Sequence, residues 1–335
     1  MRFMNNNSEY SLIPTVSDVT FGYINPSPED DGGWGDLSPN ELNPNFVTGF
    51  VDAEGSFMVL ILKNSKMKNG FQVVPCFSIG LHKKDQAILE EIKVYLQCIG
   101  NITRQTKDAV LYRVTSKKDL AVIINHFDSY PLITQKRADY ELFKQAFELV
   151  DRKEHLTPEG FHKILAIRAS INNGLSEELK VAFPDITPIL KPTISVPETI
   201  DPEWLAGFVS GEGCFYVVTS ESRSEGLIVR LRFILSQDSR DEQLMKSLIT
   251  YFGCGRCEKA KDGMVYFRVT NFADNYEKII PFFSKHQIAG IKTKDFDDWC
   301  KIAAIVKTKA HLTKEGSDQI IKIKAQMNKG RENGL

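Results

Sequence analysis

Hydrophobic and polar residues follow one another along this 335-residue chain in an order that occurs twice. Each half opens with a short apolar segment, which predicts a helix, and continues with β-rich segments around a polar turn, which predict a hairpin. In the first half, strands are predicted at 57–62, 71–81, 102–104 and 110–115, and helices at 85–99, 119–127, 136–150 and 157–172. In the second half, strands are predicted at 215–219, 227–236 and 265–270, and helices at 241–252, 292–306 and 313–328.

The two halves also share residues at a nearly constant offset. The first half contains the segment Lys153-x-His155-Leu156-Thr157-x-Glu159-Gly160. The same letters recur 156 residues later, in Lys309-x-His311-Leu312-Thr313-x-Glu315-Gly316. Asn172-x-Gly174 corresponds in the same way to Asn328-x-Gly330. A repeat this long predicts two copies of one module rather than a solenoid of short units. We therefore expect a loosely structured extension at 1–42, a first module at 43–175, a proline-rich linker at 176–200 and a second module at 201–335.

Each module begins with a related apolar segment. Residues 46–55 read F-V-T-G-F-V-D-A-E-G, and residues 204–213 read W-L-A-G-F-V-S-G-E-G. The pairs Asn43-Pro44 and Asp201-Pro202 precede them, and each pair suits a helix cap followed by a first turn. The glycine that follows the acid suits the end of the helix. The two segments therefore predict two short helices, each with a carboxylate at its C-terminal end.

Small residues give these two helices one narrow face. Gly49 and Ala53, like Gly207 and Gly211, are four residues apart and lie on one side of a helix. Such faces allow two helix backbones to approach closely. We expect the helices to pack on each other and to bring Glu54 and Glu212 together.

The composition is that of a globular protein, with 25% charged and 42% hydrophobic residues. No apolar run approaches the length of a membrane span, so no membrane partner is expected. Residues 1–45 carry a net charge of −6 and the remainder +5, which is compatible with a polyanionic partner. Cys254 and Cys257 form the one pair with metal-site spacing, but further ligands at matching spacing are missing, which favours ordinary turn or strand cysteines.

Arginines within the predicted strands indicate what the sheets contact. Alternation places Arg230 and Arg232 on one face and the apolar residues between them on the other. Arg113 and Arg268 lie in matching segments of the two modules. Two-stranded ribbons fit the major groove of DNA, where arginine reads guanine or binds phosphate. An antiparallel sheet with one solvated face is the alternative interpretation.

Two carboxylates that meet at a twofold axis repel each other unless a divalent cation lies with them. Carboxylate and carbonyl oxygens suit Mg²⁺, which could activate water and stabilise the leaving oxygen of a phosphodiester. The alternative is that Glu54 and Glu212 are exposed helix-end acids. An acid at a helix C-terminus opposes the macrodipole, which makes that purely structural role less attractive.

The segments V-T-G-F-V-D-A-E-G and L-A-G-F-V-S-G-E-G resemble the two motifs of a LAGLIDADG homing endonuclease, of the single-chain type encoded in fungal mitochondrial introns. The resemblance covers residues 43–335. It implies an α+β fold of two pseudo-symmetric αββαββα modules. The motif helices would form the module interface, and the antiparallel sheets would form a DNA-binding saddle.

The resemblance also implies site residues. Glu54 and Glu212, with the carbonyls of Ala53 and Gly211, match the metal site, which would hold Mg²⁺, with Mn²⁺ or Ca²⁺ able to replace it in binding. Gln237 matches a position that orients active-site water. Its counterpart in the first module is Leu81, so the two half-sites are expected to be unequal.

A basic residue near each scissile phosphate is expected as well. Lys136 and Lys292 match that position, each four residues before an aromatic side chain. Lys294 or Arg137 could take the role instead, and a solvated helix start is the structural alternative for both lysines.

Positions after the motifs are expected to face DNA, several of them apolar enough to contact thymine methyl groups or exclude water. These positions are Ser56, Met58, Leu60, Leu62, Asn64, Cys214, Tyr216, Val218 and Ser220. The polar side chains among them, together with further serine and arginine side chains of the two modules, give the full set of DNA-binding candidates. This set is Ser56, Asn64, Ser78, Arg104, Arg113, Tyr216, Ser220, Arg230, Arg232, Arg256 and Arg268.

The resemblance, together with the paired acids, implies a monomeric, Mg²⁺-dependent endonuclease that acts on double-stranded DNA and promotes intron mobility. Its location in mitochondria is implied by the resemblance alone. The enzyme would cut across the minor groove of a long asymmetric target and leave short 3′ overhangs. A maturase that binds intron RNA is the alternative, and a non-cleaving DNA-binding regulator is a third. Both acids are present, which favours the nuclease.

Overall fold

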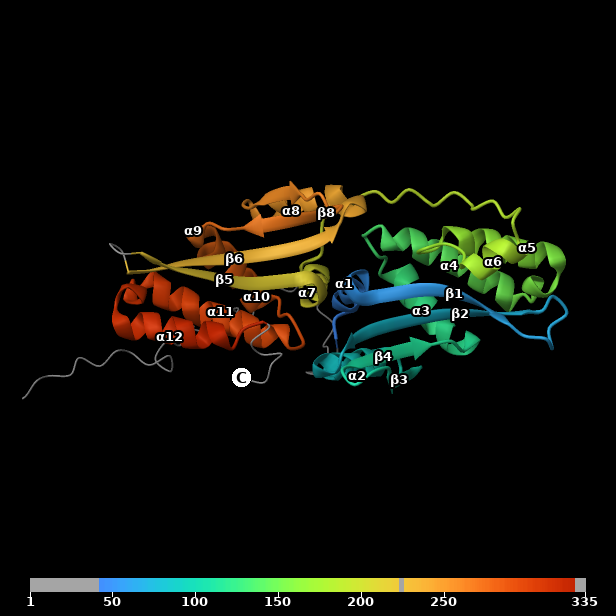
Figure 1. The fold of residues 1–335 in the computed structure, drawn as a ribbon, viewed down its shortest axis with the longest axis horizontal. Coiled ribbons are helices and arrows are strands. Elements are labelled where there is room, and N and C mark those ends of the chain that lie inside the picture. Colours follow the sequence, from blue (N-terminus) through green and yellow to red (C-terminus); the bar gives the residue numbers. More distant parts are fainter. Residues whose placement is uncertain (1–41, 223–225, 329–335) are drawn as a thin grey trace, which may run out of the picture. The chain divides into compact units, whose positions relative to one another are not determined.

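The computed structural model describes residues 42–222 and 226–328. The predicted extension at 1–42 therefore lies outside the described residues, apart from Leu42. Within the described part, the chain forms two α+β modules with the same order of elements (Figure 1). The predicted fold class is confirmed.

The first module consists of one motif helix, a four-stranded sheet and the helices that cover the sheet. Its elements are α1 (Pro44–Glu54), β1 (Gly55–Lys63), β2 (Phe71–His82), η2 (Lys83–Asp85), α2 (Gln86–Tyr95), β3 (Asn101–Arg104), β4 (Ala109–Val114), α3 (Lys117–Ser129), α4 (Lys136–Asp151), η3 (Glu154–Leu156) and α5 (Pro158–Ser170).

The second module repeats this order. Its elements are α7 (Pro202–Glu212), β5 (Gly213–Ser222), β6 (Gly226–Asp238), η4 (Ser239–Asp241), α8 (Glu242–Phe252), β7 (Arg256–Lys259), β8 (Met264–Val269), α9 (Phe272–Asp274), η5 (Asn275–Ile279), α10 (Ile280–Lys285), α11 (Lys292–Lys307), η6 (Ala310–Leu312) and α12 (Lys314–Ala325).

Both sheets are antiparallel and have equivalent strand orders, β1-β2-β4-β3 and β5-β6-β8-β7. Their registers correspond as well, because Gly55 lies opposite Ile79 and Gly213 lies opposite Leu235. Two residues beyond these partners, Leu81 and Gln237 take equivalent positions, as the sequence predicted.

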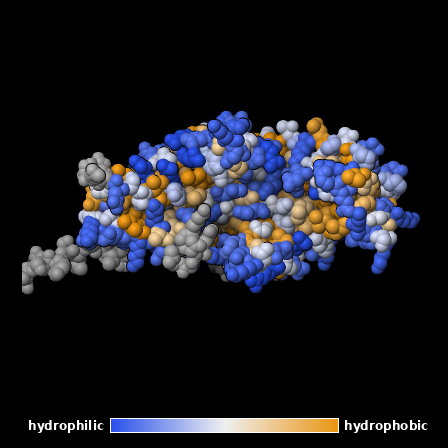
Figure 2. Space-filling model, viewed as in Figure 1, coloured by the Kyte–Doolittle hydropathy of each residue, from blue (hydrophilic) through white to orange (hydrophobic). Residues whose placement is uncertain are grey.

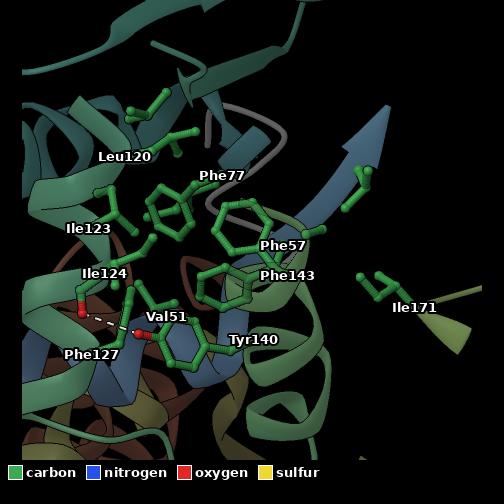
Figure 3. Close-up of a cluster of buried hydrophobic side chains, with 14 of the residues drawn as sticks. Val51, Phe57, Phe77, Leu120, Ile123, Ile124, Phe127, Tyr140, Phe143 and Ile171 are labelled. Carbon is green, nitrogen blue, oxygen red and sulfur yellow. Dashed lines mark hydrogen bonds between the residues drawn. The ribbon is translucent and has the colours of Figure 1, made fainter. Parts of the chain in front are cut away.

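Each sheet buries one face under its helices around a central phenylalanine. In the first module, the rings of Phe77, Phe127, Tyr140 and Phe143 lie 5.2–5.5 Å from that of Phe57 (Figure 3). The hydroxyl of Tyr140 donates to the carbonyl of Ile124 at 3.1 Å, so the polar end of this ring is satisfied. In the second module, Phe215 takes the central place among Phe233, Phe283, Phe296 and Trp299.

The repeated asparagines tie the last helix of each module to its first strand. Asn172 and Asn328 have positive φ values of 51° and 52°, which asparagine adopts more readily than most residues. Their side-chain amides donate to the carbonyls of Phe57 and Phe215, at 2.8 and 3.1 Å. The shared residues of the repeat therefore mark a turn that both modules need.

Some elements differ from the sequence prediction. Helix α2 ends at Tyr95 rather than at residue 99, because Gln97 and Cys98 take positive φ values of 58°. The edge strand β7 and the helical stretch from α9 to α10 were not predicted. Strand β7 is polar, and Pro281 lies inside the helical stretch, where proline normally indicates a helix end. The predicted linker at 176–200 contains one short helix, α6 (Glu177–Ala182), which was not predicted.

Helices α1 and α7 pack against each other through their backbones (Figure 1). A Cβ on Gly49 would lie 1.9 Å from the carbonyl oxygen of Trp204, and one on Gly207 would lie 2.0 Å from that of Phe46. Both positions therefore require glycine. The predicted caps are present, with Asn43 accepting from the Asn45 amide and Asp201 from the Glu203 amide, each at 2.8 Å.

The face of the protein seen in Figure 2 is mainly polar. Figure 2 shows hydrophilic residues over most of the visible face, with smaller hydrophobic groups between them. Within the described ranges, no helix combines the length and the apolar character that crossing a membrane requires.

Replacing Gly207 by alanine should destabilise the protein by about 3 kcal/mol, because the added methyl group overpacks a backbone contact that a rotamer change cannot relieve. Urea unfolding measures this. Gly80→Ala is the matched control, since its Cβ would lie 3.6 Å from the nearest atom, a Leu111 methyl group. Equal midpoints for the two variants would contradict the close packing of α1 and α7.

Candidate active site

The C-terminal ends of α1 and α7 bring Glu54 and Glu212 together. A Cβ on Gly211, the residue before Glu212, would lie 3.3 Å from Oε1 of Glu54. Both helices end at the acid, as predicted, and the glycine that follows is extended, since Gly55 has φ −75° and ψ 156° and starts β1 directly. Its small size is what matters, since a Cβ on Gly55 would lie 2.8 Å from the Val51 carbonyl oxygen.

Two lysines reach the ends of these helices from α4 and α11. The ammonium group of Lys136 donates to the carbonyls of Val51 and Ala53, at 2.9 and 3.1 Å. The ammonium group of Lys292 donates to the carbonyl of Gly211. The lysines thus contact the two carbonyls, of Ala53 and Gly211, that the sequence offers as metal ligands. Arg137, the alternative to Lys136, pairs with Glu141 instead.

The four charged side chains influence one another in a poorly solvated place. Burial raises the pKa of Glu54, while Lys292 and Lys136 lower it. Burial raises the pKa of Glu212 as well, and the charge of Glu54 raises it further. The pKa values of both lysines are lowered, chiefly by burial, although the carboxylates act to raise them. The positive charges of the two lysines thereby offset the negative charges of the two glutamates.

A buried aspartate holds the loop before α4. Asp52 is 1% exposed, and its carboxylate accepts from the Ile133 amide at 3.0 Å, the Thr134 hydroxyl at 2.5 Å and the Trp204 indole at 2.8 Å. The last of these bonds joins the two modules. Ser210 is the counterpart of Asp52 in the second module, where it accepts from the Ala289 amide at 2.9 Å.

Two further acids contact the helices that carry the lysines. Asp85 accepts from the amide of Ile291, and Asp241 accepts from the amide of Gln135, each at 2.7 Å. Asp52, Asp85 and Asp241 were not predicted from the sequence as site residues. The available signal was the repeat, since Asp85 and Asp241 are offset by the same 156 residues as the repeated histidines.

The two half-sites differ around their acids. Leu81 lies with Glu54 along a hollow of about 560 Å³. At the equivalent place in the second module, the side-chain oxygen of Gln237 accepts from the Asp238 amide at 2.9 Å. The equivalent positions of the two modules therefore carry unlike side chains, one apolar and one amide.

The donor set is sparse for an all-protein metal site. No group of three or more His, Cys, Asp or Glu residues that could hold a metal occurs within residues 42–222 and 226–328. Cys254 and Cys257 pack against the second core, and burial raises the pKa of both thiols. Two carboxylates with adjacent backbone carbonyls fit Mg²⁺, which is commonly held by one or two carboxylates together with substrate phosphates.

The uncovered face of the second sheet gathers basic and aromatic side chains. Register places Tyr216 opposite Arg232, Val218 opposite Arg230, and Arg256 opposite Arg268. The guanidinium of Arg268 lies 4.5 Å from the ring centroid of Tyr266. Residues directly opposite each other in a ladder share one face, so this face is polar and rich in arginine. Glu258 lies on the same face and forms ion pairs with both Arg256 and Arg268.

The first sheet presents a less basic face. Register aligns Ser56, Ser78, Arg113 and Asn101 in one row, but Ser78 is only 4% exposed. Arg104 lies opposite Val110, which belongs to the core face, and its guanidinium donates to the carbonyls of Thr106 and Lys107 in its own hairpin.

At the hairpin end of the first sheet, Asn64 donates to the Gln72 side chain at 3.2 Å. The structure therefore places Arg104 and Asn64 apart from the row that contains Ser56 and Arg113.

Comparison with known proteins gives matches in both modules. A model of the LAGLIDADG endonuclease family matches residues 47–147 and 205–303. The probable intron-encoded endonuclease 3 of Neurospora crassa is 41% identical over 283 residues, which are 83% of this chain and 53% of that protein. The probable intron-encoded endonuclease 2 of the same fungus is 42% identical over 296 residues, 84% of this chain and 64% of that protein. The chain thus spans less than two thirds of the length of either relative.

Solved structures match over nearly their whole length. The LAGLIDADG homing endonuclease I-SmaMI, bound to cleaved DNA, has a TM-score of 0.85 and 48% identity, covering 87% of this chain and 99% of that one. I-SmaMI has also been solved on an uncleaved DNA target with calcium ions. Lysine-to-alanine variants of it have been solved as well.

Replacing Asp241 by asparagine should raise the free energy of unfolding at neutral pH. Burial raises the pKa of Asp241 from 3.8 to about 6. Between these values the unfolded chain releases a proton that the folded protein retains, so the carboxyl group lowers stability as pH rises. The gain from asparagine should appear above about pH 4, reach on the order of 3 kcal/mol near pH 6 and stay constant above it. Urea unfolding at several pH values measures this.

Asp108→Asn is the control, because its ion pair with Lys83 lowers the pKa of Asp108, so that neutralising it should bring no gain. A gain for Asp241→Asn that did not change with pH would contradict the burial of this carboxyl group.

Proposed function

Because the chain belongs to the LAGLIDADG endonuclease family, we propose that it is a site-specific double-strand DNA endonuclease. The observation that carries this proposal is the meeting of Glu54 and Glu212, with one lysine from each module beside them. Two hydrolytic centres that lie side by side are what cutting both strands of a duplex requires. The alternative of RNA binding alone would not need paired acids.

We propose Mg²⁺ as the working ion, held by the carboxylates of Glu54 and Glu212 and by the carbonyls of Ala53 and Gly211. These carbonyls would become free for the ion once the ammonium groups of Lys136 and Lys292 turn from them to the DNA phosphates. The ion would supply an activated water and stabilise the leaving oxygen. Mn²⁺ or Ca²⁺ would replace it in binding, and the calcium ions with uncleaved DNA in I-SmaMI support a divalent requirement.

The chain's own residues would bind and orient the phosphates. Lys136 and Lys292 would contact phosphate oxygens near the scissile bonds, because a compact ammonium group with three donors suits a phosphate. The side chain of Gln237 would orient a water in one half-site, whereas Leu81 could not do so in the other. The two strands would therefore be cut at different rates.

The uncovered faces of the two sheets would bind the duplex as a saddle. Two-stranded ribbons fit the major groove, and cationic side chains there bind phosphates or read guanine. We propose contacts from Ser56, Ser78, Arg113, Tyr216, Ser220, Arg230, Arg232, Arg256 and Arg268. Asn64 and Arg104 would contact DNA only after leaving their present hydrogen bonds. Arg256 and Arg268 would likewise have to leave their ion pairs with Glu258.

A single chain with two unlike modules fits a monomer on a long asymmetric target. Cutting would take place across the minor groove and leave short 3′ overhangs. The intron-encoded relatives support a role in intron mobility, and we place the activity in mitochondria on the family resemblance.

Glu54→Gln and Glu212→Gln should each abolish double-strand cutting of DNA that carries the intron-insertion sequence. We expect a loss of at least about 1,000-fold, or about 4 kcal/mol of transition-state stabilisation, because one metal ligand is neutralised. Glu90→Gln, at an exposed position of α2, should cut normally. Unchanged cutting by either active-site variant would refute these roles, and intron-RNA binding by both variants without any wild-type cutting would favour the maturase.

Replacing both Arg230 and Arg232 by alanine should weaken DNA binding and reduce its salt dependence. Each lost phosphate contact lowers the slope of log affinity against log salt by about 0.9. Fluorescence anisotropy with Ca²⁺ at several salt concentrations measures this. Arg152→Ala is the control, since that exposed side chain pairs with Glu154 at 2.9 Å away from the sheet. A slope equal to that of the wild type would remove both arginines from the interface.

A further inference from the structure

Two aspartates form a reciprocal contact between the modules. Asp85 ends the short η2 turn after β2 of the first module, and its Oδ1 accepts from the amide of Ile291 in the second at 2.7 Å. Asp241 ends the η4 turn after β6 of the second module, and its Oδ1 accepts from the amide of Gln135 in the first at 2.7 Å. Each acid therefore crosses to the other module.

The two acceptors meet the starts of the helices that carry the active-site lysines. Gln135 immediately precedes Lys136 at the start of α4, and Ile291 immediately precedes Lys292 at the start of α11. Neither helix has a side-chain cap from its own N-cap residue. A helix start has unsatisfied amides and a positive partial charge, so a carboxylate from outside can take the place of a cap.

The local structure is shaped for these contacts. Gly290, just before Ile291, has φ +76°, and a Cβ there would lie 2.6 Å from Oδ1 of Asp85. Asp241 is only 6% exposed, and burying a carboxylate is costly unless donors satisfy it. Asp85 and Lys292 line the same hollow of about 740 Å³, together with Cys214 and Tyr216.

We propose that Asp85 and Asp241 are positioning residues that act across the module interface. Each module fixes the start of the helix whose first residue is the other module's active-site lysine. The ammonium group of that lysine is thereby held at the end of its own motif helix, on Gly211 for Lys292 and on Ala53 for Lys136. Each half-site is incomplete without a residue of the opposite module. This inference rests on the proposed endonuclease function.

The test is strand-resolved cleavage of a target labelled on each strand in turn. Lys292→Met and Lys136→Met first identify the strand that each lysine serves. Asp85→Ala should then slow cleavage of the same strand that Lys292→Met affects. The expected slowing for Asp85→Ala is about 10- to 100-fold, because a small displacement of a positioned group has effects of this size. The other strand should change by about twofold or less. Asp241→Ala should give the reverse pattern, matching Lys136→Met.

Three controls separate positioning from general damage. Asp85→Asn and Asp241→Asn keep an oxygen that can accept the amide, so they should recover most of the lost rate. Glu90→Ala should slow neither strand. DNA binding with Ca²⁺ should be the same for all variants within about threefold, since the lysines act on rate. Where an alanine variant does not fold, a serine variant replaces it. The serine side chain is too short for its hydroxyl oxygen to reach the amide.

Equal slowing of both strands, slowing of the wrong strand, or asparagine variants no better than alanine variants would overturn the proposal. Amide hydrogen exchange tests the contacts independently of cutting. The amides of Ile291 and Gln135 should exchange faster in the respective alanine variants, and unchanged protection would also overturn the proposal. If the wild-type protein cuts no DNA, the proposed function fails, and the exchange experiment still decides whether the acids position these helices.

Discussion

The backbone contact between α1 and α7 is the constraint on which the other features of the structure depend. At Gly49 and Gly207 the two helices approach until only a hydrogen atom fits between one backbone and the other. This closeness sets the spacing of the helix ends, where Glu54 and Glu212 lie, and it leaves the two sheets extending from the same interface. A larger residue at either glycine would separate the acids as well as the modules. Packing and chemistry are thus fixed by the same pair of residues.

Charge balance explains why so many ionisable groups can share this interface. Two partly buried carboxylates would repel each other strongly if they were alone. Lys136 and Lys292 supply two positive charges and bind the carbonyls at the helix ends. The lysines in turn belong to helices whose starts are held by Asp85 and Asp241 of the opposite modules. The network therefore runs across the interface twice, which couples the two half-sites physically.

The symmetry of the network is incomplete, and the differences are specific. The carboxylate of Asp52 accepts four hydrogen bonds, three from the loop residues Ile133 and Thr134 and one from Trp204 of the other module. Its counterpart Ser210 holds its loop through one hydroxyl group. Leu81 and Gln237 occupy equivalent register positions with different chemistry. The second sheet gathers more arginines on its uncovered face than the first. A chain that joins two modules can vary each one separately, which a symmetric dimer of identical chains cannot do.

The sequence by itself determined the two modules, most helices and strands, the caps of α1 and α7, and the paired acids. These features follow from periodicity, capping and small-residue spacing, which depend on residues close together in the chain. Strand β7 and the stretch from α9 to α10 were missed because their local patterns are polar or contain proline. The placement of Lys136 on Ala53, and of Asp85 and Asp241 on the opposite modules, was decided by the tertiary structure. The joined groups lie 83 to 206 residues apart. Packing of α4 near α1 within the first module brings Lys136 to Ala53, whereas the contacts of Asp85 and Asp241 need the two modules to pack on each other.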